Sequence, residues 1–414
     1  MILDFSRLQA VLADARVARL LATLDGDGEE TRVVGGAVRN ALVGRAVHEV
    51  DLTTTATPDV TRARAEAAGF KVVPTGLAHG TLTIVVAGEP YEVTSLREDV
   101  ETDGRRAVVR FGRDFAADAL RRDFTVNALS VDARGEIHDY AGGLDDLSAG
   151  RVRFIGDARR RIREDYLRIL RFFRFTADFA RGPVNAAGLD AAIRERAGLA
   201  ILSRERVRAE MLRLVAARRA GEIVRLLGET GIAEGLIGAA GEGGRLDRAI
   251  AADRAPIARL AAFCVRVRED AERLRDRLRL SNEETKRVLA FAALVERLHG
   301  AAGTLGEGEI RALVADHPPV AVGDALAALS GEPRPVVEPE ARAALAAFQA
   351  DPGSVPTLPL RGADLVKAGV PKGPAVSLGL AAARRTWLAA GCPADPASRA
   401  ALLREALAAA RAAD

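Results

Sequence analysis

The spacing of hydrophobic and polar positions changes near residue 150 of this 414-residue chain. Before that point, β-branched stretches that often alternate apolar with polar residues predict strands, and helix-like stretches separate them. The predicted strands are residues 31–36, 48–54, 69–73, 80–88, 90–96 and 127–133. The run Ala-Gly-Glu-Pro at 87–90 predicts a turn that joins two of these strands as a hairpin.

The chain after about residue 155 is rich in Ala, Leu and Arg, and Gly and Pro interrupt its helical periodicity. The pattern therefore predicts an α/β head of about 150 residues followed by a long all-α body. Residues 1–24 are predicted to form one amphipathic helix. They contain internal acids and lack the layout of a signal peptide, and no apolar run reaches transmembrane length. We therefore expect a cytoplasmic protein with no membrane partner.

The basic residues indicate polyanionic partners. Net charge is only +3, but just four of the basic residues are Lys, and Arg binds phosphate in a bidentate manner and stacks on bases. A GC-rich genome also favours Arg codons, so location is more informative than the count. Residues 151–174 hold nine Arg against three acids, which predicts RNA or nucleoside triphosphates as partners. The two cysteines, Cys264 and Cys392, are too few for a disulfide framework or a zinc cluster.

Gly35 and Gly36 lie where a predicted strand ends and a helix would begin. Glycines at such a point let the backbone approach a ligand closely, and free N–H groups there can bind phosphate. The spacing is not that of the dinucleotide fingerprint, and no GxxxxGK[ST] loop occurs in the sequence. Taken alone, the pair could equally form a plain turn.

Three carboxylates form the candidate catalytic centre. Glu49 and Asp51 are two residues apart on one predicted strand, so they would share a face, and a bound Mg²⁺ would relieve their repulsion. Solvated residues at a strand edge are the alternative. Glu92 lies on another predicted strand. If the two strands are neighbours, three acids could surround two metal ions.

The run RRDFTVNAL at 121–129 could bind the rest of a nucleotide. Arg121 and Arg122 would meet a polyphosphate, while Asp123 and Asn127 would contact a ribose or orient an arginine. A salt-bridge group at a helix end is the alternative reading of this run.

Residues 163–175 are predicted to be helical, which would place Asp165 and Arg168 on one face. Such a pair offers one hydrogen-bond acceptor beside a fork of donors. Cytosine and adenine complement that pattern, and uracil and guanine do not. A surface ion pair is the alternative.

Together these motifs resemble those of class II tRNA nucleotidyltransferases and bacterial poly(A) polymerases. The similarity covers roughly residues 30–215. Its motifs are, in order, GGxVR at 35–39, the carboxylates at 49 and 51, residues 76–84, 121–129, 145–147 with 155–157, 164–168 and 203–215. Residues 360–374 resemble a segment of the family's tail.

The resemblance implies an α+β fold. A polymerase beta-like nucleotidyltransferase head with a mixed sheet would occupy 1–150, and an elongated all-α neck, body and tail would follow. The neck, at 151–218, would read the base, and the body and tail, at 219–414, would hold the tRNA. The predicted site residues are Glu49 and Asp51 for metal, these two with Glu92 for catalysis, Gly35, Gly36, Arg39, Arg121, Arg122, Asp123 and Asn127 for phosphate and ribose, and Glu164, Asp165 and Arg168 for the base.

The expected reaction is attack by the 3′-hydroxyl of tRNA on the α-phosphate of CTP or ATP, with Mg²⁺ as cofactor and no protein partner evident. The long polar stretch 96–122 resembles the loop that accompanies full CCA addition in the family. A poly(A) polymerase and an A-adding or CC-adding enzyme are alternatives. Glu49 and Asn40 stand where the family usually or often has Asp, and an inactive RNA-binding protein is a further alternative.

Overall fold

The computed structural model describes residues 2–76, 80–98, 110–239 and 241–412. Parts of the motif at 76–84 and of the stretch 96–122 therefore lie outside the described residues. The chain divides into two compact units, Met1–Leu202 and Ser203–Asp414. The predicted head and most of the predicted neck fall within the first unit, and the three-part division at 150 and 218 remains a prediction.

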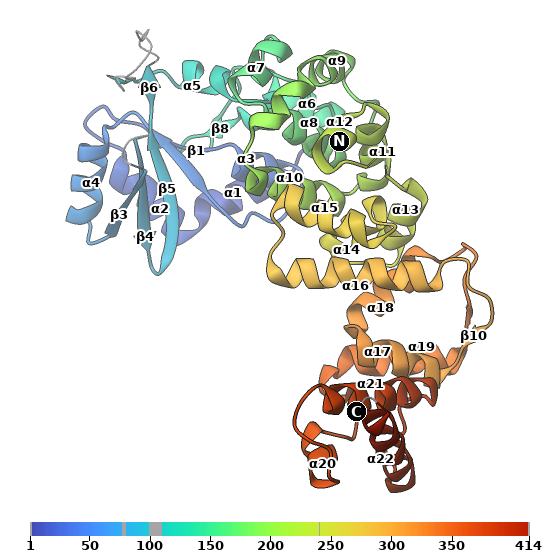
Figure 1. The fold of residues 1–414 in the computed structure, drawn as a ribbon. Coiled ribbons are helices and arrows are strands. Elements are labelled where there is room, and N and C mark those ends of the chain that lie inside the picture. The colour runs from blue at the N-terminus through green and yellow to red at the C-terminus, as the bar shows by residue number, and fades with distance from the viewer. Residues whose placement is uncertain (1, 77–79, 99–109, 240, 413–414) are drawn as a thin grey trace. The chain divides into compact units, whose positions relative to one another are not determined.

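The first unit contains all of the predicted strands (Figure 1). Its elements are α1 (Phe5–Ala13), α2 (Ala15–Leu24), β1 (Thr31–Val34), α3 (Gly36–Leu42), β2 (Asp51–Thr54), α4 (Pro58–Ala67), β3 (Lys71–Gly76), β4 (Thr81–Val86), β5 (Glu89–Ser95), β6 (Arg97–Glu98), β7 (Arg110–Phe111), α5 (Phe115–Arg121), η2 (Thr125–Asn127), β8 (Ser130–Val131), β9 (Ile137–His138), α6 (Gly143–Ala149), α7 (Ala158–Glu164), α8 (Leu167–Phe179), α9 (Ala186–Glu195) and η3 (Arg196–Ile201).

Among the described residues, a seven-stranded sheet has the order β3-β4-β5-β2-β1-β8-β9. β2 pairs with β5 in parallel, whereas β1 pairs with β2 and with β8 antiparallel, so the sheet is mixed as expected. The predicted hairpin is also confirmed, because β4 and β5 pair antiparallel around Ala87 and Gly88, both at positive φ. This order places the start of β2 between the end of β1 and the middle of β5.

The N-terminal segment differs from the single helix that its periodicity predicts. Asp14 ends α1 with a φ of −57° and a ψ of 123°, outside the helical region, and its carboxylate accepts a hydrogen bond from the Arg16 amide at 2.9 Å. Asp favours such a cap because its short side chain satisfies an amide at the start of a helix. α1 and α2 are therefore two helices.

Aromatic side chains join α8 to the segment that follows α5. Phe124 is buried, with its ring centroid 4.8 Å from that of Phe154 and 5.2 Å from that of Phe175. Phe172 is also buried, 5.4 Å from Phe154. The face of α8 that carries these rings is thus fixed against the motif at 121–129.

The second unit is helical apart from one small exception (Figure 1). Its elements are α10 (Arg204–Ala216), α11 (Ala220–Glu229), α12 (Ile232–Ile237), α13 (Gly243–Ala251), α14 (Pro256–Cys264), α15 (Arg268–Leu278), α16 (Asn282–Leu298), β10 (Thr304–Leu305), α17 (Glu307–Asp316), α18 (Pro319–Ala328), β11 (Val336–Val337), α19 (Pro339–Ala350), η4 (Pro352–Ser354), α20 (Gly362–Lys367), α21 (Pro374–Ala389) and α22 (Pro396–Arg411). The prediction that strands stop near 155 is wrong in one place, because β10 and β11 form a short parallel pair. Two residues per strand are too few to give a periodic signal in the sequence.

In the described part of the chain, no helix is both long enough and apolar enough to cross a membrane.

Candidate nucleotidyl-transfer site

Asp51 and Glu92 are brought together by the register of two strands. β2 and β5 pair in parallel with Leu52 opposite Val93, so the preceding residues, Asp51 and Glu92, are also neighbours. Paired residues of adjacent strands project from the same face of a sheet. The condition on which the third carboxylate depended is therefore met: its strand lies next to the one that carries Asp51.

Glu49 also lies near Asp51, but not through the shared strand face that its spacing predicts. β2 begins at Asp51, so Glu49 lies in the irregular segment before the strand and does not share a strand face with Asp51. Both side chains are exposed. The alternating pattern of 48–54 predicts a longer strand, but β2 begins only at Asp51, opposite Val34, the last residue of β1.

The pKa of the Asp51 carboxyl is raised above its ordinary value. The largest cause is desolvation by surrounding protein, although solvent still reaches the side chain, and repulsion from Glu92 and Glu49 adds to it. Only the charge of Arg122 acts in the opposite direction. Three carboxylates thus raise one another's electrostatic energy, and a bound cation with oxygen ligands would relieve that repulsion. The residues present fit a hard divalent metal ion.

Gly35 connects the carboxylates to the basic motif. Its φ is +64°, a conformation that favours glycine, and a Cβ built on it would lie 2.8 Å from a guanidinium nitrogen of Arg122. Arg122 is close to Asp51 as well, since its positive charge opposes the rise in the pKa of that carboxyl. The glycine turn, one arginine and the acidic cluster therefore meet at the end of β1.

Arg121 and Arg122 share a partner at the end of α5. Arg122 donates to an Asp118 carboxylate oxygen at 3.3 Å and to the backbone oxygen of Asn127 at 3.3 Å. Arg121 lies 3.5 Å from the other Asp118 oxygen. Both guanidinium groups are about a quarter exposed, at 29% and 27%, so they remain accessible to an anion. Asp118 is a residue that the sequence interpretation missed, although its i, i+4 spacing to Arg122 is the signal that would have found it.

Asp123 and Asn127 face inward and orient arginines. Asp123 is 7% exposed, and its carboxylate accepts from Asn127 at 2.9 Å and from Arg171 of α8 at 2.6 Å. Asn127 in turn accepts from Arg39. Of the two roles expected for Asp123 and Asn127, the arrangement matches the orientation of an arginine. Arg171 was missed because its partner lies 48 residues earlier in the sequence.

Arg39 is buried, which its place in the GGxVR motif does not reveal. It is 8% exposed, and its guanidinium lies over the rings of Phe175 and Phe179, 4.9 and 4.4 Å from their centroids. Asn40 accepts a second hydrogen bond from it at 2.9 Å. Burial lowers the pKa of Arg39 to about 9, so it is still a cation at neutral pH. These contacts lie inside the protein and connect α3 to α8.

The predicted continuous helix at 163–175 is wrong, because it breaks at Asp165. α7 ends at Glu164, Asp165 is extended with a φ of −155°, and α8 begins at Leu167. The Asp165 carboxylate accepts from the Leu167 amide at 3.1 Å, which is the competing local bond that makes Asp favour helix starts. Asp165 and Arg168 therefore do not lie one turn apart on one helix.

Arg168 pairs instead with Glu164. The two side chains are 2.6 Å apart, and Arg168 also donates to the backbone oxygen of Arg161 at 2.9 Å. Burial opposes ionisation of Glu164, but hydrogen bonds from Arg168 and Arg161 outweigh it and hold the pKa of Glu164 below its ordinary value. Glu164 is thus the acid that fixes Arg168.

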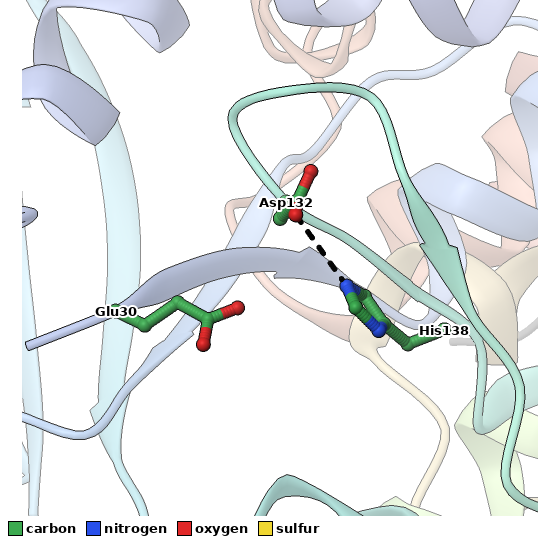
Figure 2. Close-up of side chains that lie close together, drawn as sticks. All are labelled: Glu30, Asp132 and His138. Atoms are coloured by element: carbon green, nitrogen blue, oxygen red, sulfur yellow. Dashed lines mark ion pairs between the residues drawn. The ribbon is translucent and has the colours of Figure 1, made fainter.

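A second group of metal-ligating side chains lies at the opposite end of β1 (Figure 2). Glu30 precedes β1, while Asp132 and His138 come from β8–β9, and their ligand atoms all lie within 4.8 Å of one another. Arg32 donates to Glu30 at 2.6 Å, and Arg134 donates to Asp132 at 3.1 Å. Because each acid already has its own cation, this cluster needs no metal for charge balance.

A cavity of about 710 Å³ opens beside the acidic cluster. Its lining comes from α1, α2, the segment 45–50 and the start of β5, and it includes Glu49. The other predicted site residues do not line this cavity.

Two family models match the chain. The "Poly A polymerase head domain" covers residues 31–153, and the "Probable RNA and SrmB- binding site of polymerase A" covers residues 189–238. The first contains the glycine turn, all three carboxylates and the motif at 121–129. Over these ranges the chain is similar to CCA-adding tRNA nucleotidyltransferases and bacterial poly(A) polymerases.

Members of this family are similar to the chain over much of its length. A "CCA tRNA nucleotidyltransferase 1, mitochondrial" from Danio rerio is 40% identical over 264 residues, which are 62% of this chain and 61% of the relative. A "CCA-adding enzyme" from Geobacillus thermodenitrificans is 39% identical over 235 residues, 56% of this chain and 57% of the relative. The chain thus spans about three fifths of the length of these curated family members.

Solved structures of family members have the same fold. The CCA-adding enzyme of Bacillus stearothermophilus in complex with CTP matches with a TM-score of 0.69 and 27% identity, and the match covers 92% of this chain and 93% of that one. The Thermotoga maritima CCA-adding enzyme complexed with tRNA matches with a TM-score of 0.66 over 99% of both chains. At 19% identity the second match shows only the fold.

Proposed function

We propose that the protein is a CCA-adding tRNA nucleotidyltransferase that adds C, C and A to the 3′ end of tRNA from CTP and ATP. The observation that carries the proposal is the register of β2 and β5, which places Asp51 beside Glu92 next to the glycine turn and Arg122. The relatives' names and the complex with CTP supply the substrate class. We propose that the protein is located in the cytoplasm.

The acidic cluster is the proposed metal centre. Glu49, Asp51 and Glu92 would hold Mg²⁺, since their mutual repulsion favours a hard divalent ion. When bound, such ions lower the pKa of an attacking hydroxyl and neutralise charge on a leaving phosphate. Glu49 is one methylene longer than the family's usual Asp, and its irregular backbone segment can accommodate that length where a strand position would not.

The glycine turn and the basic motif are the proposed triphosphate seat. Gly35 and Gly36 let the backbone approach the phosphates, and Arg122 presents its guanidinium directly beside that turn. Arg121 adds a second donor group from the same helix end. Arg39, Asp123 and Asn127 act as positioning residues, because their buried network with Arg171 fixes the seat against α8.

Base selection is assigned to the junction of α7 and α8. Asp165 offers acceptors from an extended backbone, and Arg168 offers donors that Glu164 holds in place. An acceptor beside donors suits C and A, which present an amino donor beside a ring-nitrogen acceptor, whereas U and G present a carbonyl acceptor beside a ring N–H donor. The break between the helices gives Asp165 an orientation that a continuous helix would not.

The decisive experiment supplies tRNA lacking its 3′ CCA, with Mg²⁺ and either CTP, ATP or both. We expect two C residues with CTP alone, none with ATP alone, and CCA with both. A long A tract with ATP alone would make the protein a poly(A) polymerase, and one partial product would make it an A-adding or CC-adding enzyme. Tight tRNA binding without any incorporation would make it an inactive RNA-binding protein.

The base-reading role has its own test. Arg168→Ala should lower kcat/KM for CTP and ATP together and narrow their advantage over UTP and GTP, by roughly 1–3 kcal/mol per lost pairing. Arg194→Ala removes an exposed i, i+4 partner of Asp190 and is the matched control for a surface ion pair. If the ratios of kcat/KM among the four nucleotides are unchanged in Arg168→Ala, Arg168 does not read the base.

A further inference from the structure

The second unit has an arginine-lined pocket that the proposed chemistry does not use. Its volume is about 550 Å³, within the range of small-molecule sites, and it lies among α13, α18 and α19. Four arginines line it, and no carboxylate from the described residues does. They are Arg248, Arg254, Arg334 and Arg342.

This lining is unusual for the second unit, where arginines are typically paired with acids. Such pairs are Arg208–Glu284, Arg225–Asp247, Arg245–Glu332, Arg259–Asp253, Arg287–Asp324 and Arg384–Asp316. Within the pocket only Arg248 has an acidic partner, Glu332. Among the described residues, no acid lies within ion-pair distance of Arg254, Arg334 or Arg342.

Backbone carbonyl groups hold three of the four guanidinium groups in place. Arg248 donates to Ala328 at 2.7 Å, Arg334 to Leu329 at 3.1 Å, and Arg342 to Val337 at 3.1 Å. Carbonyl oxygens orient a guanidinium without cancelling its charge. The site is therefore both positive and preorganised, which reduces the entropy lost when an anion binds.

The fourth arginine carries an unsatisfied donor. Arg254 is half-buried, and its Nε has no hydrogen-bond partner and no exposure to solvent. Burial and the charge of Arg342 together lower the pKa of Arg334, so these cations repel one another without a counter-ion. A polyatomic anion would satisfy several of these donors at once.

We propose that this pocket binds a phosphate group. Several convergent guanidinium groups suit phosphate, because its oxygens accept bidentate pairs from a planar fork of donors. Apolar residues also line the pocket, Leu326 and Ala346 among them, which suits the carbon part of a phosphate ester. The phosphate belongs either to an RNA backbone, which rests on the proposed function, or to a free phosphorylated small molecule, which does not.

The test titrates inorganic phosphate into the full chain without Mg²⁺ or nucleotide, by calorimetry. We expect Arg254→Gln/Arg342→Gln to remove one class of bound phosphate, with affinity at least tenfold weaker there. Ala346→Glu keeps all four arginines and adds a carboxylate on an exposed position of α19, so it should remove the same class while leaving thermal unfolding intact. Arg385→Gln, at an exposed position on α21, is the control for the loss of a surface arginine outside the pocket.

Two arms separate the sources of the phosphate. With tRNA lacking CCA, an RNA source requires the double variant to show a shallower dependence of log affinity on log salt, by about 0.9 per lost contact, than Arg385→Gln. A small-molecule source leaves that slope equal to the control while phosphate binding is lost. Phosphate binding that is unchanged in both the double variant and Ala346→Glu overturns the proposal. Because no nucleotide addition is measured, failure of the proposed function would not produce that result.

Discussion

Two carboxylate clusters lie at opposite ends of β1, and they differ in how their charge is balanced. At the start of the strand, Arg32 pairs with Glu30 and Arg134 with Asp132. At its end, Asp51 faces the repulsion of Glu92 and Glu49, with only Arg122 acting against it. The first cluster is complete with protein groups alone, whereas the second is arranged for a cation from outside. Charge balance therefore distinguishes the two clusters better than the number of acids does.

The pKa directions express the same difference. Burial would raise the pKa of Asp132, but hydrogen bonds from the Glu136 backbone N–H and from the side chain and backbone N–H of Arg134 outweigh it, so the pKa is lowered. Asp132 then contributes stability above its ordinary pKa, and that stability is lost as pH falls through the lowered value. The pKa of Asp51 is raised, so its favourable contribution exists at low pH and is lost as pH rises through the raised value.

The largest expected effect is the loss of catalysis at the unbalanced cluster. Asp51→Ala should reduce nucleotide incorporation by roughly 10³-fold or more, about 4 kcal/mol of transition-state stabilisation, while tRNA affinity stays near wild type. Single-turnover rates and a filter-binding assay measure the two quantities. Near-normal turnover in Asp51→Ala would show that Asp51 does not hold the metal, and the contrast between the two clusters would then be wrong.

The matched change at the balanced cluster should affect stability instead. Asp132 is 3% exposed and accepts from the amides of Arg134 and Glu136, each at 2.9 Å. Asp132→Ala leaves both donors unsatisfied and should cost roughly 2–3 kcal/mol of unfolding free energy, a fall in Tm of about 4–12 °C. Activity per folded molecule should persist at low temperature. A stable but inactive Asp132→Ala would show that the two clusters had been assigned the wrong way round.

Mg²⁺ should stabilise the protein through the unbalanced cluster alone. At a tenfold excess over Kd, binding adds about 1.4 kcal/mol at neutral pH, and the effect should fade as pH drops and Asp51 is protonated. Thermal unfolding with and without Mg²⁺ measures it in wild type, Asp51→Ala and Glu30→Ala. Persistence in Asp51→Ala together with loss in Glu30→Ala would identify the other cluster as the metal site.

The smallest effect is expected where a pair is exposed. The Arg134 side chain is 80% exposed, so Arg134→Gln should cost under about 1 kcal/mol and leave Mg²⁺ stabilisation unchanged. Chemical denaturation measures the difference. A loss as large as that of Asp132→Ala would mean that the arginine, rather than the backbone amides, holds the carboxylate.

The sequence predicted what depends on local periodicity and motif order. The strands and the hairpin at 87–90 follow from alternating patterns and a turn, whereas the pairing of β2 with β5, which brings Asp51 beside Glu92, was only a condition of the hypothesis. The break at Asp165 did not follow, because the side chain bonds the Leu167 amide where the periodicity continues through it. Local competition between a side chain and the helix decides such points.

Contacts between segments that are distant in the sequence could not be predicted either. The sequence motif predicts that Arg39 binds phosphate at the surface. In the structure its guanidinium lies over the rings of Phe175 and Phe179, which come from a helix far along the chain. Glu49 lies outside the strand predicted for it, because β2 begins only at Asp51. Neither the burial of Arg39 nor the position of Glu49 before β2 can be predicted from the spacing of neighbouring residues.

The burial of Arg39 has a practical consequence at the bench. Salt screens exposed charges strongly and buried ones weakly, so the contacts of Arg39 with Asn127 and the two rings should survive ionic strengths that strip nucleic acid from the protein. A high-salt wash during purification should therefore remove co-purifying RNA without loosening α3 from α8. The protein recovered from such a column should need only desalting, with no refolding step, before it is assayed.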